Sequence, residues 1–276
     1  MGNQIKKIVM QVIFVAYSVV VIYPMVWLLY TSFKSSGELF ASAWALPTVL
    51  RWGNYVEAWK DAQIGEFFFN SVFVTITTVA IQLIVGGMAS YVLARYTFRG
   101  GQQVYYYFLA GLMFPIFLAL VPMFFLLKSL RLLDSHMGLI GIYIASGIPF
   151  SVFVLTAFFK TIPKEMEEAG LIDGCSPYGV FWRIMLPLAK PGLITVAIFT
   201  FIAIWNEYVV ALVVLASSFL RTLPLGIANL MMVEHYKTDW GSLFAGLVIV
   251  MLPTVIGYIV LQERITKGIT VGALKG

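Results

Sequence analysis

Residues 67–94 read FFFNSVFVTITTVAIQLIVGGMASYVLA, a stretch of 28 residues with no Asp, Glu, Lys or Arg. An α-helix that crosses the hydrocarbon layer of a membrane needs roughly 20 mainly apolar residues. Similar stretches precede and follow it, and together they predict six transmembrane helices near residues 8–33, 67–94, 104–127, 137–159, 191–215 and 240–262. Helices are favoured over a β-barrel because barrel strands are short and alternate in polarity. We therefore predict an all-α membrane protein whose residues 1–276 form a single transmembrane domain.

The composition of the whole chain supports this class and excludes several others. Hydrophobic residues make up 61% of the 276 residues and charged residues 11%, and the mean hydropathy is +0.92. Soluble domains contain about 25% charged residues, so a water-soluble enzyme and a disordered chain are both excluded. Cys175 is the single cysteine, which excludes an internal disulfide, and no Cys or His cluster predicts a metal site. The net charge of +5 is spread between apolar stretches and forms no patch for nucleic acid.

The charged residues between the stretches predict how the chain crosses the membrane. A cleaved signal peptide is disfavoured at the N-terminus because residues 8–33 are uncharged over 26 positions, whereas a signal core spans about 7–15. With six helices both termini lie on one side of the membrane. If that side is the inside, 11 of the 18 basic residues are internal, in agreement with the positive-inside rule.

The long inner loop, residues 160–190, holds the most informative local pattern. Pro163 and the acids after it suit the first turn of a short helix, and Gly174 can end that helix in a left-handed conformation. Ser176 and Pro177 then read as the cap and first turn of a second helix with an apolar side. Such a loop could dock into a cytosolic partner through its acids and small residues, or it could simply be a solvated loop. No fingerprint for binding a nucleotide occurs in the chain, so any energy from ATP must come from another protein.

The residues of this loop resemble the EAA loop of ABC-importer permeases. The match runs through Glu168-Ala169-Gly170-Leu171-Ile172-Asp173-Gly174, followed by Leu186-Pro187-Leu188 at the expected distance. Gly170 stands where that family usually has alanine. The resemblance implies that the loop is a coupling helix for a cytosolic ATPase.

Two further stretches resemble one branch of that family. Residues 201–208, FIAIWNEY, look like the fifth span of carbohydrate-importer permeases, and residues 267–276 are similar to the tail of the second, six-span permease subunit of maltose-type importers. The resemblance implies a non-catalytic chain in a bacterial or archaeal inner membrane, with both termini cytoplasmic. The implied partners are a second permease subunit, two ABC ATPases that carry the ATP and Mg, and an extracytoplasmic solute-binding protein. This chain itself would bind no cofactor.

The same resemblance assigns roles to residues of the chain. Glu168 would contact the ATPase, Ala169 and Gly170 would permit close packing against it, and Asp173 and Gly174 would set the end of the helix. The tail, residues 268–276, would also reach the ATPase, and the outer loop, residues 216–239, would contact the binding protein.

Glu207 is the one acid inside a predicted span. A charge at membrane depth is costly and favours a place in the solute pathway, although solvation near the outer surface or a bond to a neighbouring helix through Asn206 would also accommodate it. Trp205 and Tyr208 could stack on a sugar or serve as packing. The candidate residues for the solute pathway are therefore Trp205, Asn206, Glu207 and Tyr208. Prolines that could kink helices occur inside the third, fourth and sixth spans (Pro115, Pro122, Pro149 and Pro253).

The alternatives to a sugar importer differ in class. A permease for another solute shares the inner-loop motif, and an ion-driven secondary transporter shares the spans but usually shows internal repeats and several buried polar sites. An intramembrane enzyme is disfavoured because no span contains a pair of catalytic groups.

Overall fold

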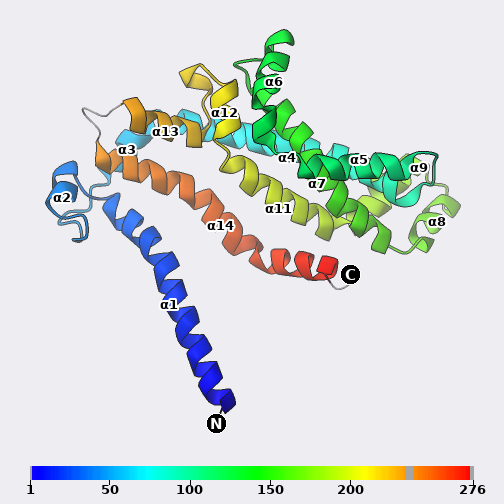
Figure 1. The fold of residues 1–276 in the computed structure, drawn as a ribbon, viewed down its shortest axis with the longest axis horizontal. Coiled ribbons are helices and arrows are strands. Elements are labelled where there is room, and N and C mark those ends of the chain that lie inside the picture. The colour runs from blue at the N-terminus through cyan, green and yellow to red at the C-terminus, as the bar shows by residue number, and fades with distance from the viewer. Residues whose placement is uncertain (1, 234–238, 274–276) are drawn as a thin grey trace. The chain divides into compact units, whose positions relative to one another are not determined.

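A computed structural model describes residues 2–233 and 239–273, and within these residues the chain is helical, with no strand. The helices of the first part of the chain are α1 (Gly2–Thr31), α2 (Ser36–Ala41), α3 (Gly53–Lys60), α4 (Ile64–Arg95), α5 (Gly101–Met113), α6 (Ile116–Ser129) and α7 (His136–Thr161) (Figure 1). The rest are α8 (Glu165–Ile172), α9 (Pro177–Val180), the π-helix η1 (Phe181–Met185), α10 (Leu186–Leu188), α11 (Lys190–Trp205), α12 (Val209–Val214), the 3-10 helix η2 (Ser218–Leu220), α13 (Leu223–Val233) and α14 (Trp240–Ala273). The all-α membrane class predicted from the sequence is confirmed.

Four of the six predicted spans are single helices in the structure. Among the described residues, α1, α4, α7 and α14 contain segments long and apolar enough to cross a membrane, and two bent helix pairs raise the number to as many as six. The predicted third span is one of these pairs, because α5 and α6 meet at an angle of 102°. Proline disfavours helical backbone at the residue before it. Phe114 is accordingly extended (ψ 117°), and the helix breaks between Phe114 and Pro115.

The fifth predicted span, residues 191–215, was wrong as a single helix. Its main helix, α11, ends at Trp205. At its other end, α11 makes an angle of 74° with the preceding helical segment, residues 177–188. Residues 206–208 separate α11 from the short helix α12. Hydropathy does not detect this break, since the residues on both sides of it are equally apolar.

Contacts divide the chain into two compact units: unit 1 comprises residues 1–68 and 226–253, and unit 2 comprises residues 69–225 and 254–276. That the whole chain acts as one membrane domain stays a prediction. Polar and aromatic contacts within unit 1 join α1, the turn after it, α3 and α14. The Asn54 amide donates to the carbonyls of Ser32 and Lys34, both at 2.8 Å, and the rings of Trp27 and Phe244 meet edge to face at 5.4 Å.

Among the described residues of unit 2, two apolar clusters are both built on α7, which packs against α5 and α11 (Figure 1). The first cluster contains Leu139, Ile142 and Tyr143 of α7 with Val210 and Val214 of α12. The second contains residues of α4, α7 and α11 together with residues of the inner loop: Tyr91, Leu155, Phe159, Val180, Phe181, Met185, Ala189 and Val196. The second cluster thereby holds the inner loop against α4, α7 and α11.

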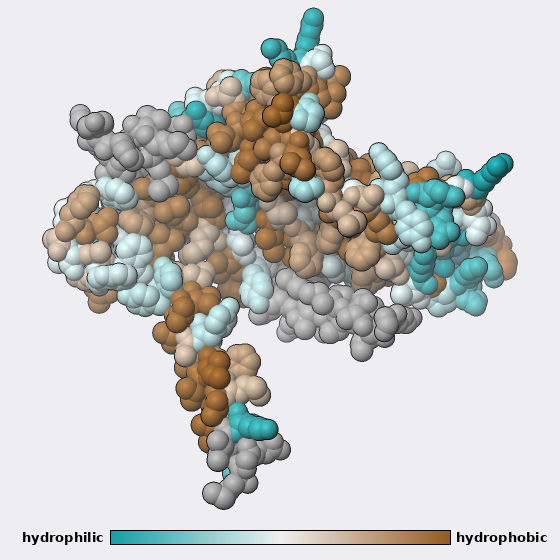
Figure 2. Space-filling view, viewed as in Figure 1, coloured by the Kyte–Doolittle hydropathy of each residue, from teal (hydrophilic) through white to brown (hydrophobic). Residues whose placement is uncertain are grey.

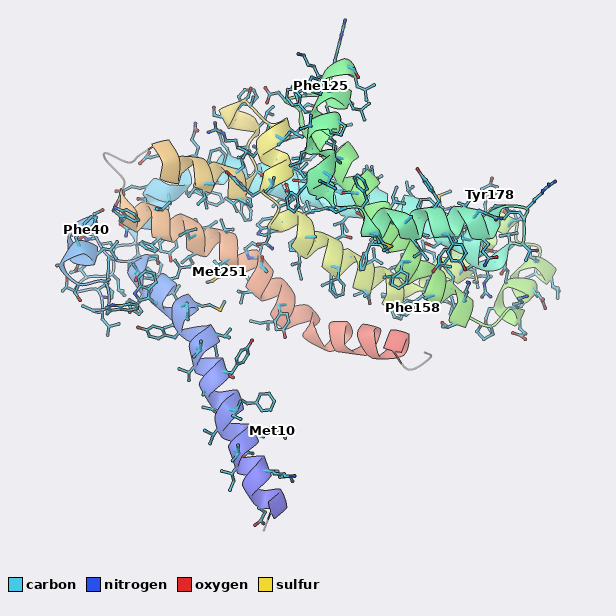
Figure 3. All side chains as sticks on the ribbon, viewed as in Figure 1. Met10, Phe40, Phe125, Phe158, Tyr178 and Met251 are labelled. Carbon is cyan, nitrogen blue, oxygen red and sulfur yellow. The ribbon has the colours of Figure 1, made fainter. Side chains whose placement is uncertain are left out.

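Much apolar surface is exposed, as expected for helices that face lipid or another membrane subunit. Met10 on α1 and Phe125 on α6 project away from the helices that carry them (Figure 3). In contrast, hydrophilic side chains gather over the part of unit 2 that carries α8 and α9 (Figure 2). The polar inner loop is therefore the part of unit 2 suited to water or to a soluble partner.

Candidate functional site

The inner loop forms the two helices that its sequence predicts. Helix α8 has Glu165, Glu167 and Glu168 in its first turn, where carboxylates stabilise the positive end of a helix. Gly174 follows it with φ +82°, the left-handed conformation that glycine adopts at little cost. The Ser176 hydroxyl accepts a hydrogen bond from the Gly179 N–H at 3.2 Å and so caps α9.

Helix α8 has an outer and an inner side. Glu165, Glu168, Ala169 and Ile172 are exposed and follow the i, i+3, i+4, i+7 spacing of one helix face, with 85% of Ile172 exposed. We call these four residues the outer side of α8. Asp173 and Gly174 are also exposed at the end of the helix. Glu167 and Gly170 lie on the opposite side and contact the rest of unit 2.

Gly170 is therefore not where the resemblance had led us to expect it. It is buried, and a Cβ at this position would clash with Cδ1 of Ile184 on η1 and would crowd Val180. Its small size allows α8 to lie close against the following helices of the same loop. Of the two small residues expected to meet a partner, only Ala169 lies on the exposed side.

Glu167 ties α8 to the end of α4, a contact that the sequence analysis missed. The Tyr91 hydroxyl donates to one carboxylate oxygen of Glu167 at 2.6 Å, and Arg95 Nε lies 3.5 Å from the other. Arg95 also donates through Nη2 to the carbonyl of Ile162 at 2.6 Å. The i, i+4 spacing of Tyr91 and Arg95 places both on one face of α4, but no sequence pattern indicates which of the acids of α8 they would meet.

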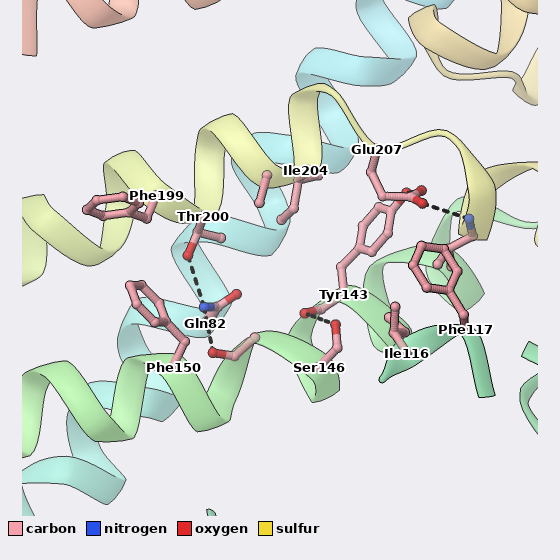
Figure 4. A pocket seen from close by; sticks show the side chains of 13 residues that line it. Gln82, Ile116, Phe117, Tyr143, Ser146, Phe150, Phe199, Thr200, Ile204 and Glu207 are labelled. Atoms are coloured by element: carbon pink, nitrogen blue, oxygen red, sulfur yellow. Dashed lines mark hydrogen bonds between the residues drawn. The ribbon is translucent and has the colours of Figure 1, made fainter. Parts of the chain in front are cut away.

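A cavity of about 480 Å³ lies in unit 2 between α4, α6, α7 and α11 (Figure 4). Aromatic rings from three helices line it (Phe117, Phe150 and Phe199), and its polar groups come from Gln82, Tyr143, Ser146, Thr200 and Glu207. This combination of apolar rings and a few polar groups is typical of small-molecule sites.

Gln82 is a buried amide inside a span, and the sequence analysis did not single it out. Its Nε2 donates to Thr200 Oγ1 and to the Gly147 carbonyl, both at 3.0 Å (Figure 4), and also contacts Ser151 Oγ at 2.8 Å. One side chain of α4 therefore joins α7 and α11. A glutamine within an uncharged stretch was the available signal, since a polar side chain in a membrane helix requires a partner.

Glu207 lies in the break after α11 and is half-buried. Its carboxylate accepts hydrogen bonds from the Val210 N–H at 2.7 Å, from the Ala211 N–H at 3.1 Å and from the Tyr143 hydroxyl at 2.5 Å. It thus replaces the backbone acceptors that α12 lacks at its start and joins that helix to α7. A neighbouring helix does accommodate the carboxylate, but through Tyr143 and not through Asn206.

Of the four residues proposed for the pathway, Glu207 alone is among the residues that line this cavity. Trp205 is buried and stacks on Phe201 with ring centroids 5.6 Å apart. Tyr208 packs against the first apolar cluster of unit 2, and the exposed Asn206 amide donates to the Ile202 carbonyl at 2.8 Å. In this conformation Trp205 and Tyr208 serve as packing.

Parts of two other predicted contact regions lie outside the described residues. Residues 234–238 of the outer loop and 274–276 of the tail are not described, nor are the side chains of residues 260–273. Within the described part of the chain, no three His, Cys, Asp or Glu side chains are grouped so as to hold a metal ion.

Residues 82–271 match the family of binding-protein-dependent transport system inner membrane components. The chain belongs to this family. The matched region includes the cavity, the inner loop and its contact with α4. The family is thus the importer-permease family that the inner-loop motif resembles.

Individual relatives match nearly the whole chain. The diacetylchitobiose uptake system permease protein NgcG of Streptomyces coelicolor is 41% identical over 95% of this chain and 86% of its own length. The trehalose transport system permease protein SugB of Mycobacterium tuberculosis is 32% identical over 92% of each chain. A chain in a crystal structure of a bacterial ABC transporter involved in the import of the acidic polysaccharide alginate shares the fold, with a TM-score of 0.84 and 22% identity over 95% of this chain and 97% of that one.

Proposed function

We propose that this chain is a transmembrane permease subunit of an ATP-driven ABC importer that takes up a sugar, an oligosaccharide or a related glycoside. Its family membership supports the importer, and the names of its relatives support the sugar, since these proteins are permeases for diacetylchitobiose and trehalose. A non-sugar solute is the alternative within the family.

The outer side of α8 is the observation that carries the coupling role. Glu168 and Ala169 of the EAA motif are exposed there beside the apolar Ile172, while the inner side of the helix is fixed to unit 2. A short helix fixed on one side and exposed on the other can dock into a groove on a partner. We propose that this partner is a cytosolic ABC ATPase, which holds the ATP and Mg, while the chain itself is non-catalytic.

The complete importer would contain one copy of this chain, a second permease subunit, two ATPase subunits and an extracytoplasmic binding protein. In such a complex the inner loop faces the cytoplasm, which puts both termini there as well. Closure of the ATPases around ATP would move α8 and so favour one of two membrane conformations over the other.

We further propose that the sugar passes along the cavity of unit 2, where Phe117 and Phe150 offer aromatic faces beside polar groups. Aromatic faces suit the apolar C–H faces of a sugar ring. Phe117→Ala is expected to raise the solute concentration for half-maximal uptake and to leave ATPase assembly intact. Unchanged uptake kinetics in this variant would remove the chain from the sugar path.

The coupling role is tested by Glu168→Lys in the full complex reconstituted in liposomes. Charge reversal on the outer side of α8 is expected to release the ATPase or to abolish the sugar-stimulated part of its activity. Asp61→Lys is the matched control, because Asp61 is an exposed acid in the predicted outer loop between α3 and α4. Full sugar-stimulated ATP hydrolysis by the Glu168→Lys complex would refute the proposal.

The energy source separates this function from an ion-driven transporter. Uptake into the liposomes is expected to require internal ATP and to survive an ionophore that collapses ion gradients. Uptake that continues without ATP and stops with the ionophore would establish the alternative.

A further inference from the structure

We propose that Tyr91, Arg95 and Glu167 form a mechanical joint through which movement of α8 is passed to α4. We call these three residues the α4–α8 joint; they are positioning residues that act through the helices and touch no solute. The inference rests on the proposed function, since it describes how the docking helix would move the membrane helices.

The joint connects three elements over short distances. Glu167 of α8 accepts from the Tyr91 hydroxyl at 2.6 Å and lies 3.5 Å from Arg95 Nε, and Arg95 donates to the Ile162 carbonyl at the end of α7. The Arg95 and Glu167 side chains are 5% and 15% exposed, so water screens their attraction only weakly. The carboxylate thus has a hydrogen bond at one oxygen and the Arg95 charge beside the other, and the guanidinium group is held in place by its Nη2 hydrogen bond.

The chemistry of the joint resists sliding. Apolar packing, such as that of Gly170 on Ile184, has no preferred direction and permits small shifts along the contact. A buried ion pair with additional hydrogen bonds is directional, and displacement of one partner leaves the other charge unpaired in a poorly solvated place. Glu167 therefore fixes the position of α8 along α4.

Helix α4 can carry the movement into the membrane body. Gln82 lies 13 residues before Arg95, about 20 Å away along the helix axis, and bonds to both α7 and α11. Between these positions, the Tyr91 ring lies 5.2 Å from the ring of Phe181 in the inner loop. A shift of α8 applied at Arg95 thus reaches the helices that line the cavity through one continuous element.

The first test measures how many solute molecules are moved per ATP in the reconstituted complex. Glu167→Gln is expected to lower this ratio by about fivefold or more, the size of a typical coupling between sites, while subunit assembly and ATP hydrolysis persist. Glu66→Gln is the matched control: the same change at an exposed acid in the first turn of α4, away from the joint and from the outer side of α8. Glu167→Asp keeps the charge and is expected to recover part of the ratio.

A cross-link makes the test independent of folding defects. Tyr91→Cys and Glu167→Cys are combined with Cys175→Ser, which removes the natural cysteine. With its thiols reduced, this variant is expected to hydrolyse ATP with poor transport, and a short thiol cross-linker between α4 and α8 is expected to restore transport. If the cross-link instead blocks transport, the two helices must move relative to each other and the proposal is wrong.

The outcomes distinguish this inference from the function on which it rests. If the wild-type complex shows no ATP-driven sugar uptake, the proposed function fails. If the wild type transports and Glu167→Gln keeps the wild-type ratio, only the joint is refuted.

Discussion

At the scale of single residues, Gly170 makes a prediction about the geometry of the inner loop. An added Cβ clashes with the end of the flexible Ile184 side chain and lies 3.3 Å from Cγ2 of Val180, so Gly170→Ala requires a rotamer change of Ile184 costing about 1 kcal/mol. The gain in helix propensity is about the same, so we expect a melting temperature close to that of the wild type. A rotamer change of Ile184 does not make room for the larger side chain of Gly170→Leu. This variant is expected to displace α8 and to reduce sugar-stimulated ATP hydrolysis by about tenfold or more. Equal activity of the two variants would contradict this packing.

Glu38 makes a prediction about pH. Its carboxylate accepts from the Ser35 N–H at 2.9 Å and from the N–H and hydroxyl of Thr48, and these bonds lower the pKa of Glu38 to about 2. A carboxyl whose pKa is lower in the folded state stabilises the fold above its ordinary pKa of 4.5 and loses that effect as the pH falls towards 2. The difference in melting temperature between the wild type and Glu38→Gln should therefore be constant from pH 7 to about 5 and should vanish by about pH 2. A difference that grows as the pH falls would contradict this sign.

The residues of the inner loop show what the sequence can predict at this scale. Gly174 and Ser176 were predicted correctly, because the end of a helix and its cap depend on the local backbone. The side on which Gly170 lies and the partner of Glu167 were not, because they depend on Ile184 and Arg95, which are distant along the chain. An eight-residue helix with acids all round gives no amphipathic pattern from which to orient it.

At the scale of helices, the hydrogen bonds of Gln82 are expected to contribute to the stability of the helix packing. Gln82→Leu removes the hydrogen bonds that join α4 to α7 and α11, and it leaves hydroxyl groups of Ser151 and Thr200 without this donor. Hydrogen bonds between membrane helices contribute about 0.6–2 kcal/mol, so we expect a loss of stability in that range. Gln102→Leu is the control, because Gln102 is exposed and its amide bonds to Tyr106 within the same helix. Equal melting temperatures for the two variants would show that the buried amide adds nothing.

The number of apolar helices was predictable from hydropathy, whereas the breaks in two of them were only partly so. Pro115 was identified as a site of bending, and the chain does break before it. The break at residues 206–208 was missed because apolar residues lie on both sides of it, so the polar Asn206 and Glu207 were read as part of one continuous span. What permits that break is the carboxylate of Glu207, which satisfies the first N–H groups of α12 from outside the helix. The amino-acid composition shows how apolar a segment is, but it does not show which groups accept the hydrogen bonds of its backbone N–H groups.

At the scale of the whole molecule, the inner loop gives a direct test of topology. Cys175 is the one cysteine in the sequence, and it is half-buried beside α8. A small thiol reagent that cannot cross membranes is expected to label Cys175 in inside-out vesicles and to leave it unlabelled in intact cells. Ser217→Cys on a Cys175→Ser background should show the reverse, since Ser217 lies in the loop predicted to face outward. Labelling of Cys175 from outside would invert the orientation.

The exposed apolar surface of the chain predicts that its thermal stability depends on assembly with another subunit. None of the apolar segment of α1 is buried within the chain, and only 28% to 44% is buried in the corresponding segments of α4, α7 and α14. A second permease subunit that covers part of this surface binds the folded state and so stabilises it by mass action, by about 2.7 kcal/mol at a hundredfold excess over its dissociation constant. For a chain of this size that corresponds to a rise of about 5–10 °C in the melting temperature. Protease digestion along a temperature ramp, followed through an affinity tag on this chain alone, reports its unfolding in both samples. A melting temperature that is the same for the chain alone in detergent and for the assembled complex would mean that lipid, and not a companion subunit, covers these helices.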